Sequence, residues 1–203
     1  MRRIGCLLLF FLLVGSVHAR TSVFAFSWSG SAKPAKDPAK DIDLQLPGRT
    51  FSIYGYRLGC FAGGHQELYG IATSALCNTD ASVGGFQIAG LVNIAEDATA
   101  GVWQIAGGGN EISKRGNGIQ ISGFANASDG EYFNGLQIAG LTNVSMGEYN
   151  GAQIGLVNMA TKMIGLQIGV MNRAKSLCGV QLGLINIESD AKVEFIPIFR
   201  VGW

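Results

Sequence analysis

The stretch from Gly151 to Asn186 reads GAQIGLVNMATKMI, GLQIGVMNRAKSLC and GVQLGLIN, which is one unit written three times at a spacing of 14 residues. Each copy consists of Gly, an apolar residue, Gln, Ile or Leu, a second Gly, two apolar residues and Asn. Four longer copies precede these three, beginning at Gly85, Gly101, Gly118 and Gly135. The repeated amides are Gln87, Asn93, Gln104, Asn110, Gln120, Asn126, Gln137, Asn143, Gln153, Asn158, Gln167, Asn172, Gln181 and Asn186. Most of the chain is therefore one short motif, and its repetition points to a single array.

The repeats predict an all-β array. Apolar-rich runs of about ten residues alternate with polar turn clusters, for example Lys114–Asn117 and Ser128–Glu131, at the regular spacing that is typical of successive strands. A helix is disfavoured because each unit contains Gly twice and breaks the 3.6-residue period of an apolar helix face.

Two arrangements of these strands are open. In the first, about ten strands form an antiparallel meander that closes into a small barrel, with aliphatic side chains towards lipid and the Gln/Gly face inwards. Strands of about ten residues match the thickness of a bilayer. The C-terminal stretch from Phe195 to Trp203 alternates and ends on an aromatic residue, which resembles the last strand of outer-membrane barrels.

In the second arrangement, each repeat is one turn of a parallel β-solenoid, and the repeated Gln and Asn residues stack into amide ladders. The strict recurrence of Gln and Asn favours this stack. We favour the meander, because a polar turn cluster comes once per repeat and the alternation is unbroken over eight or nine residues.

The side-chain alternation gives each strand two different faces. In the copy that begins at Gly165, period-2 alternation places Leu166, Ile168 and Asn172 on one face and Gln167 on the other. The longer copies carry one more residue, such as Ala139, before the second Gly. Since an insertion reverses the faces beyond it, we expect a β-bulge there that restores the phase.

The repeated glutamines have a functional and a structural interpretation. They line a polar lumen or a ligand-binding ladder, or they satisfy one another and nearby backbone groups inside the array. We favour the structural role, because a barrel of about ten strands is largely filled by its own side chains.

The N-terminus has the pattern of a signal peptide over residues 1–19. Arg2 and Arg3 precede the apolar run Cys6–Val14, which is short for a bilayer span, and small residues precede a cleavage site after Ala19. Residues 20–43 are predicted to be a flexible N-terminal segment or linker, rich in Lys, Pro and Ala. Its first part, RTSVFAFSWSG, is open between a first strand and an irregular start. Residues 44–203 form the predicted β-repeat domain.

The composition argues against several kinds of activity. Fifteen Lys and Arg residues balance 14 Asp and Glu residues, and without a basic stripe we expect no nucleic-acid partner. His65 is the single His beyond the signal peptide, which is too few for a His-based metal site or a Ser-His-Asp arrangement. Acidic residues such as Asp80 and Glu96 are expected to be solvated turn residues. We therefore predict no catalytic residue, no cofactor, no metal site and no enzymatic activity.

Cysteine usage leaves one disulfide open. Cys60, Cys77 and Cys178 remain beyond the signal peptide, so one pair at most can form. A bridge between Cys60 and Cys77 in an oxidising compartment and a role as small buried apolar residues are both compatible with the spacing.

The copies GAQIGLVN at Gly151–Asn158 and GLQIGVMN at Gly165–Asn172, with the lead-in YGYRLGCFAGGHQELYG and the finish FIPIF, resemble a family of bacterial surface-repeat proteins with GLQIGLVN-type short repeats. The resemblance spans Tyr54 to Phe199. It implies an exported, envelope-associated protein for which no catalytic residues are known. This sequence departs from the motif in its first two weak copies, where Arg57 and Ala72 stand in place of Gln.

Together these features predict an exported protein of the bacterial cell envelope with a structural or surface-interaction role. We expect it in the outer membrane or at the cell surface, with membrane lipid as a partner and an unidentified surface ligand or protein as a possible second one. The alternatives are a soluble or surface-attached β-solenoid that acts as an adhesin or binding module, and a small-solute channel.

Overall fold

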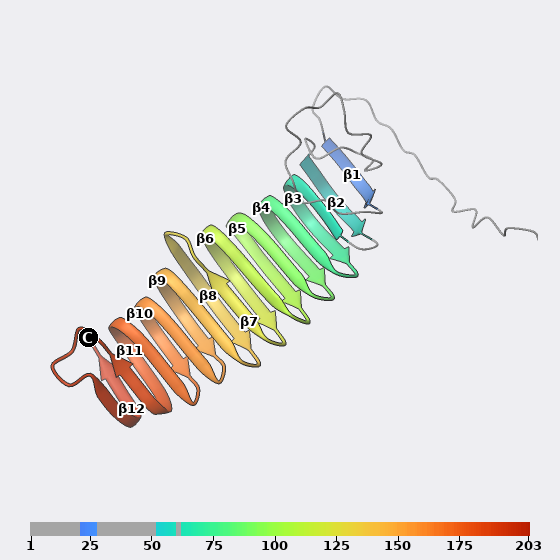
Figure 1. Cartoon of the computed structure of the whole chain (residues 1–203). Coiled ribbons are helices and arrows are strands. Elements are labelled where there is room, and N and C mark those ends of the chain that lie inside the picture. Colours follow the sequence, from blue (N-terminus) through green and yellow to red (C-terminus); the bar gives the residue numbers. More distant parts are fainter. Residues whose placement is uncertain (1–20, 28–51, 60–61) are drawn as a thin grey trace, which may run out of the picture.

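In the computed structural model, which describes residues 21–27, 52–59 and 62–203, the chain winds into a parallel β-solenoid of about eight turns. Figure 1 shows the strands side by side in chain order along one axis, with the C-terminus at one end of the stack. The strands are β1 (Thr21–Ser27), β2 (Ser52–Gly59), β3 (Ala62–Ser74), β4 (Cys77–Ala89), β5 (Val92–Ala106), β6 (Gly109–Ser122), β7 (Ala125–Ser128), β8 (Tyr132–Ala139), β9 (Thr142–Ile154), β10 (Val157–Ile168), β11 (Met171–Glu188) and β12 (Phe195–Gly202).

Each strand pairs in parallel with the strand one turn along, except at the C-terminal end. β7 and β8 together form one turn, since both pair with β6 on one side and with β9 on the other. β12 runs antiparallel to β11 and closes the end of the stack. The alternating C-terminal stretch is therefore a capping strand of a solenoid.

The prediction of an antiparallel meander that closes into a barrel is wrong, although the all-β class is right. The pairing places like residues on like: Gln167 lies opposite Gln153 on one side and Gln181 on the other. The chain bends within each repeat as well as between repeats, as at Gly169–Val170. That bend lets each turn return to its starting side, so the next repeat runs in the same direction.

The extra residue of the longer copies is accommodated in this bend and not in a β-bulge. Ala139 is the last residue of β8, and its side chain is buried. On either side of the bend, Ile138 pairs with Ile154 and Thr142 pairs with Val157, so both strands keep their register. A longer turn therefore replaces the bulge that we expected.

Two ladders of amide side chains run through the interior of the stack. In the glutamine ladder, each Nε2 donates to Oε1 of the glutamine one turn before it, at 2.7–2.8 Å from Gln104 to Gln181. In the asparagine ladder, each Nδ2 donates to Oδ1 one turn after it, at 2.8–3.0 Å from Asn78 to Asn186. The two ladders therefore have opposite polarity. Each bond contributes only about 1 kcal/mol net, but a buried amide left without its partner costs about 1–3 kcal/mol.

An ion pair closes both ladders at the N-terminal end. At this end of the glutamine ladder, Nε2 of Gln87 has no further glutamine to donate to. It donates instead to Oδ2 of Asp80 at 2.6 Å. At this end of the asparagine ladder, Oδ1 of Asn78 has no further asparagine to accept from. It accepts instead from Nη2 of Arg57 at 2.9 Å. Arg57 and Asp80 also pair with each other, and both are buried. The buried position of Asp80 corrects the expectation that it is a solvated turn residue.

The C-terminal end is closed by a second arginine and carboxylate. Arg200 of β12 lies opposite Gln181, and it is 4% exposed. Its guanidinium pairs with Oε2 of Glu188 at 2.8 Å and donates to the backbone oxygens of Val193 and Glu194. Charged groups that are buried but paired and hydrogen-bonded therefore lie at both ends of the stack, although Oε1 of Gln181 at the C-terminal end has no hydrogen-bond partner.

Beside the ladders, the core contains a cluster of mostly apolar side chains, one column of which includes Phe133 and Tyr149. Phe133 and Tyr149 stack within it with ring centroids 5.5 Å apart. Gly116 makes room for them, because a Cβ there would lie 2.7 Å from the ring of Phe133. At the bend before each glutamine, glycines such as Gly118 adopt a φ of +142°, and a Cβ would lie 1.9 Å from the carbonyl oxygen of Val102. Glycine is required at such a position by both the backbone conformation and the space.

Several predictions fall wholly or partly outside the described residues. The signal peptide of residues 1–19 lies outside them, as does most of the 20–43 segment. Within that segment, the described Thr21–Ser27 forms β1 and pairs in parallel with β2. Cys60 also lies outside, whereas Cys77 and Cys178 carry free thiols.

Candidate functional site

The side chains on either side of each buried glutamine point outwards and form a continuous sheet face. Nine parallel strands contribute to it, from β2 to β6 and from β8 to β11, and the strand register stacks equivalent residues in two columns. The exposed Val201 and Phe199 of the antiparallel β12 lie beside the ends of these columns. We call this surface the apolar face. The column before the glutamine position contains Tyr56, Ile71, Phe86, Trp103, Ile119, Leu136, Ala152, Leu166 and Val180. The column after it contains Leu58, Thr73, Ile88, Ile105, Ile121, Ile138, Ile154, Ile168 and Leu182.

The apolar face has an unusual composition for a solvent-facing sheet. None of its 18 residues is charged, and Thr73 and Tyr56 carry its only hydroxyl groups, which bond to each other at 2.8 Å. Nine of the residues are 36–46% exposed, with Trp103 the most exposed of them. At about 150–250 Å² for a large side chain, these nine alone expose roughly 600–700 Å². A contiguous patch of this size marks an interaction surface more often than a free surface.

An apolar ridge borders the apolar face along one side. It consists of the residue after the second glycine of the repeat, or after Ala75 in the turn between β3 and β4, and it is interrupted by Gly108 in the turn between β5 and β6. These ridge residues are 40–67% exposed and include Leu76, Leu91, Phe124, Leu141, Leu156, Val170 and Leu184. The ridge widens the apolar surface along the length of the stack.

Aromatic rings are concentrated in the N-terminal half of the apolar face. Phe86 and Trp103 lie next to each other with ring centroids 5.4 Å apart. At its border, Tyr54 and Tyr69 stack with centroids 5.0 Å apart. The C-terminal half instead carries smaller aliphatic residues, among them Ala152. Within these nine strands the aromatic side chains of the face are therefore confined to β2, β4 and β5.

Charged side chains gather at the other bend of the turns, between the asparagine strand and the next glycine. Lys114 pairs with Glu96 at 2.8 Å, Arg115 with Asp97 at 2.8 Å, and Lys162 with Glu148 at 2.6 Å, all on the surface. Partial burial acts to raise the pKa of Asp97, but hydrogen bonds from Thr99 and Arg115 outweigh it and hold the pKa below its usual value. Such exposed pairs contribute little to stability, and each of these three cations lies beside a carboxylate.

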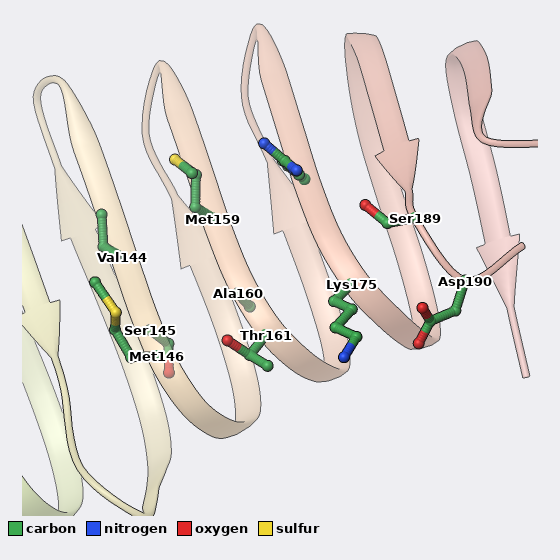
Figure 2. A pocket seen from close by; sticks show the side chains of 10 residues that line it. Val144, Ser145, Met146, Met159, Ala160, Thr161, Lys175, Ser189 and Asp190 are labelled. Atoms are coloured by element: carbon green, nitrogen blue, oxygen red, sulfur yellow. The ribbon is translucent and has the colours of Figure 1, made fainter.

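A shallow hollow of about 460 Å³ lies over the turns of β9, β10 and β11. Figure 2 shows its labelled side chains spread over successive turns, with Met146 and Met159 on neighbouring ones. Arg173, Lys175 and Asp190 bring charges of both signs to it. Polar groups do not converge on one point there, as they do in sites that orient a small molecule, so the hollow is the weaker candidate.

The sequence-predicted site residues lie in the interior. All 14 repeated Gln and Asn side chains are 0–2% exposed, and the ladders stack them against one another. They are therefore out of reach of a ligand from solvent. A small-solute channel needs an open lumen along the same axis, and these amides and the apolar cluster occupy that space.

The described residues offer little chemistry for catalysis. Among them, no three His, Cys, Asp or Glu side chains gather where they could hold a metal ion. The backbone of His65 belongs to β3, but its side chain lies outside the described part of the chain. Cys77 is half-buried and Cys178 is exposed.

The residues of the apolar face are the functional candidates that sequence reasoning missed. Period-2 alternation did separate aliphatic residues from the glutamines, but we assigned the aliphatic ones to a lipid-facing barrel wall. The available signal was the absence of charge at the two positions that flank every glutamine.

Comparison of the chain with protein-family models, curated protein sequences and solved structures finds no match. None of the described residues belongs to a helix long and apolar enough to cross a membrane.

Proposed function

We propose that this protein is a non-catalytic interaction module of the bacterial cell envelope: an exported, surface-attached β-solenoid that docks a partner on its apolar face. The observation that carries the proposal is the two-column face of 18 uncharged residues that runs along nine strands. Leaving roughly 600 Å² of this surface in water costs free energy at about 25 cal/mol per Å², and a partner that covers the face recovers it.

The hydrogen-bonded interior suits a protein that holds its apolar face in a fixed shape for a partner to bind. The amide ladders fix the spacing of successive strands, because each rung is bonded to the next at 2.7–3.0 Å. Rigid sheets keep their outward side chains in a fixed array, which lowers the entropy lost on binding. The signal-peptide pattern at residues 1–19 and the resemblance to surface-repeat proteins support export to the envelope.

The test is whether the apolar face is covered in the cell. Single cysteines replace Ile105 on the face or Met159 on the opposite side, in chains whose native cysteines are changed to serine. Ile105 is 38% exposed and Met159 is 36% exposed, so Met159 serves as the matched control. We expect a membrane-permeant maleimide to label Met159→Cys quickly and Ile105→Cys many times more slowly in intact envelopes. Equal labelling rates in envelopes would contradict the proposal, with denatured protein serving to compare intrinsic reactivities.

A further inference from the structure

We infer that the partner on the apolar face is a second copy of this chain, packed face to face with its solenoid axis reversed. The inference rests on the proposed function and names the occupant of the same surface. In this arrangement a two-fold axis lies between the two sheets, parallel to the strands, and passes over β6 at the middle of the nine strands. Such an isologous contact closes at two copies.

The available area matches what a stable dimer buries. The nine strands span about 38 Å along the axis at about 4.8 Å per strand. The exposed residues of the apolar face offer roughly 600–700 Å², and the apolar ridge beside it, 40–67% exposed, adds to this. A standard interface buries about 800 Å² per partner, so the face and part of the ridge are sufficient.

The position of Ala152 fits a reversed copy. Reversal places each column against the same column of the other copy, with β4 over β9 and β5 over β8. Phe86 then faces Ala152 of the second copy, Trp103 faces Leu136, and Ile119 lies over its own equivalent at the axis. The ring of Phe86 therefore meets the smallest side chain of the face. With parallel axes, Phe86 would meet Ile88 of the same strand in place of Ala152, and the two sheets would be held further apart there.

Charge also favours a second copy over a lipid surface. Two such faces can pack without burying a charge, because none of the 18 residues carries one. Binding to anionic lipid draws on unpaired Lys and Arg beside the inserted face. Here three of the cations at the edge, Lys114, Arg115 and Lys162, are paired with carboxylates. Aligned packing of two sheets about 10 Å apart is a common arrangement.

The first experiment measures the mass of the full chain in solution by sedimentation equilibrium from about 1 to 100 µM. We expect the wild type to be a dimer. Ile121→Lys places two lysines against each other near the axis and is expected to weaken dimerisation by about 100-fold or more. Met159→Lys is the matched control on the opposite side and is expected to leave the dimer unchanged. Circular dichroism establishes that both variants keep the strand content of the wild type.

The second experiment determines the orientation of the copies. Ile119→Cys and Tyr56→Cys are made separately, with the native cysteines changed to serine, and exposed to a short bismaleimide. In the reversed dimer, Ile119→Cys cross-links to its own equivalent, whereas the two copies of Tyr56→Cys lie about 38 Å apart and do not. Cross-linking through Tyr56→Cys would overturn the reversed arrangement.

A monomer over the whole concentration range would overturn the second copy as the partner. The proposed function is then tested separately with phosphatidylcholine vesicles and with vesicles that contain phosphatidylglycerol. Binding that Ile121→Lys abolishes and Met159→Lys preserves would identify lipid as the occupant and leave the proposed function standing. A monomer whose face is also labelled freely in envelopes would overturn both.

Discussion

Replacing a glutamine in the middle of its ladder measures how much the amide core stabilises the solenoid. Gln153 donates to Oε1 of Gln137 at 2.8 Å and accepts from Nε2 of Gln167 at 2.7 Å, and all three side chains are fully buried. Gln153→Leu fills nearly the same volume with apolar atoms. It leaves one acceptor and one donor without partners in a site that water does not reach.

The expected cost follows from these two groups. A buried polar atom that loses its partner costs about 1–3 kcal/mol, so two of them cost about 2–6 kcal/mol. Burial of the leucine side chain offsets part of this by about 1–2 kcal/mol. We therefore expect Gln153→Leu to lower the free energy of unfolding by about 1–4 kcal/mol.

The end of the ladder provides a matched control. Gln181 donates to Oε1 of Gln167 at 2.7 Å, but its own buried Oε1 has no hydrogen-bond partner. Gln181→Leu therefore orphans acceptor oxygens without orphaning an amide donor, and about half the loss is expected. Urea unfolding followed by circular dichroism at one protein concentration compares the two variants with the wild type. The reasoning is refuted if Gln153→Leu is as stable as the wild type or costs no more than Gln181→Leu.

Further substitutions probe the other features of the fold. Gly118→Ala puts a Cβ 1.9 Å from a carbonyl oxygen and should abolish the cooperative thermal unfolding transition. Gly101→Ala meets nothing within 4 Å and should cost only its backbone strain of about 1–2 kcal/mol. Equal thermal midpoints of the two variants would contradict this. Arg57→Met removes the buried cation that pairs with Asp80 and should lower the free energy of unfolding by about 3–5 kcal/mol. Amide hydrogen exchange should accelerate first in β2 to β4. Uniform acceleration along the stack would show that the ion pair does not act as a local cap. Tyr149→Phe removes bonds to two backbone oxygens and should cost about 1 kcal/mol at pH 7 in urea unfolding. Burial raises the pKa of the Tyr149 phenol above its ordinary value, so the folded state's preference for the neutral form is fully present below about pH 10 and is lost as pH rises further. The wild type should therefore lose stability more steeply above pH 10 than Tyr149→Phe, and parallel pH profiles would contradict this.

The strands and the inward position of the glutamines could be predicted from the sequence, but the direction of successive strands could not. A repeat with alternating side chains has the same pattern whether the next strand runs parallel or antiparallel. The decisive feature was the bend at Gly169–Val170, which has only two residues and no polar cluster. Because the chain turns there, Leu166 faces outwards and Asn172 faces inwards, although simple alternation places them on one face.

The residues that close the ends of the ladders could not be predicted from the repeat pattern either. Arg57 stood out as a residue in a glutamine position, and Asp80 looked like a turn residue. They become partners because the two ladders have opposite polarity, which leaves one donor and one acceptor to be matched at the same end. That polarity is a property of the stacked side chains and does not appear in the repeat itself.

Successive repeats stack in parallel and in register along one axis, and distances between spin labels test this stacking. Pulsed electron–electron double resonance measures them with one label at Ile88 and a second at Ile154, Ile168 or Leu182, in chains without native cysteines and diluted with unlabelled protein. The three second positions lie four, five and six strands along the stack from Ile88. At about 4.8 Å per strand, the account predicts separations that rise steadily through about 19, 24 and 29 Å. A separation that stops rising or falls towards Leu182 would mean that the strands curve back on themselves, and it would contradict the stacked solenoid.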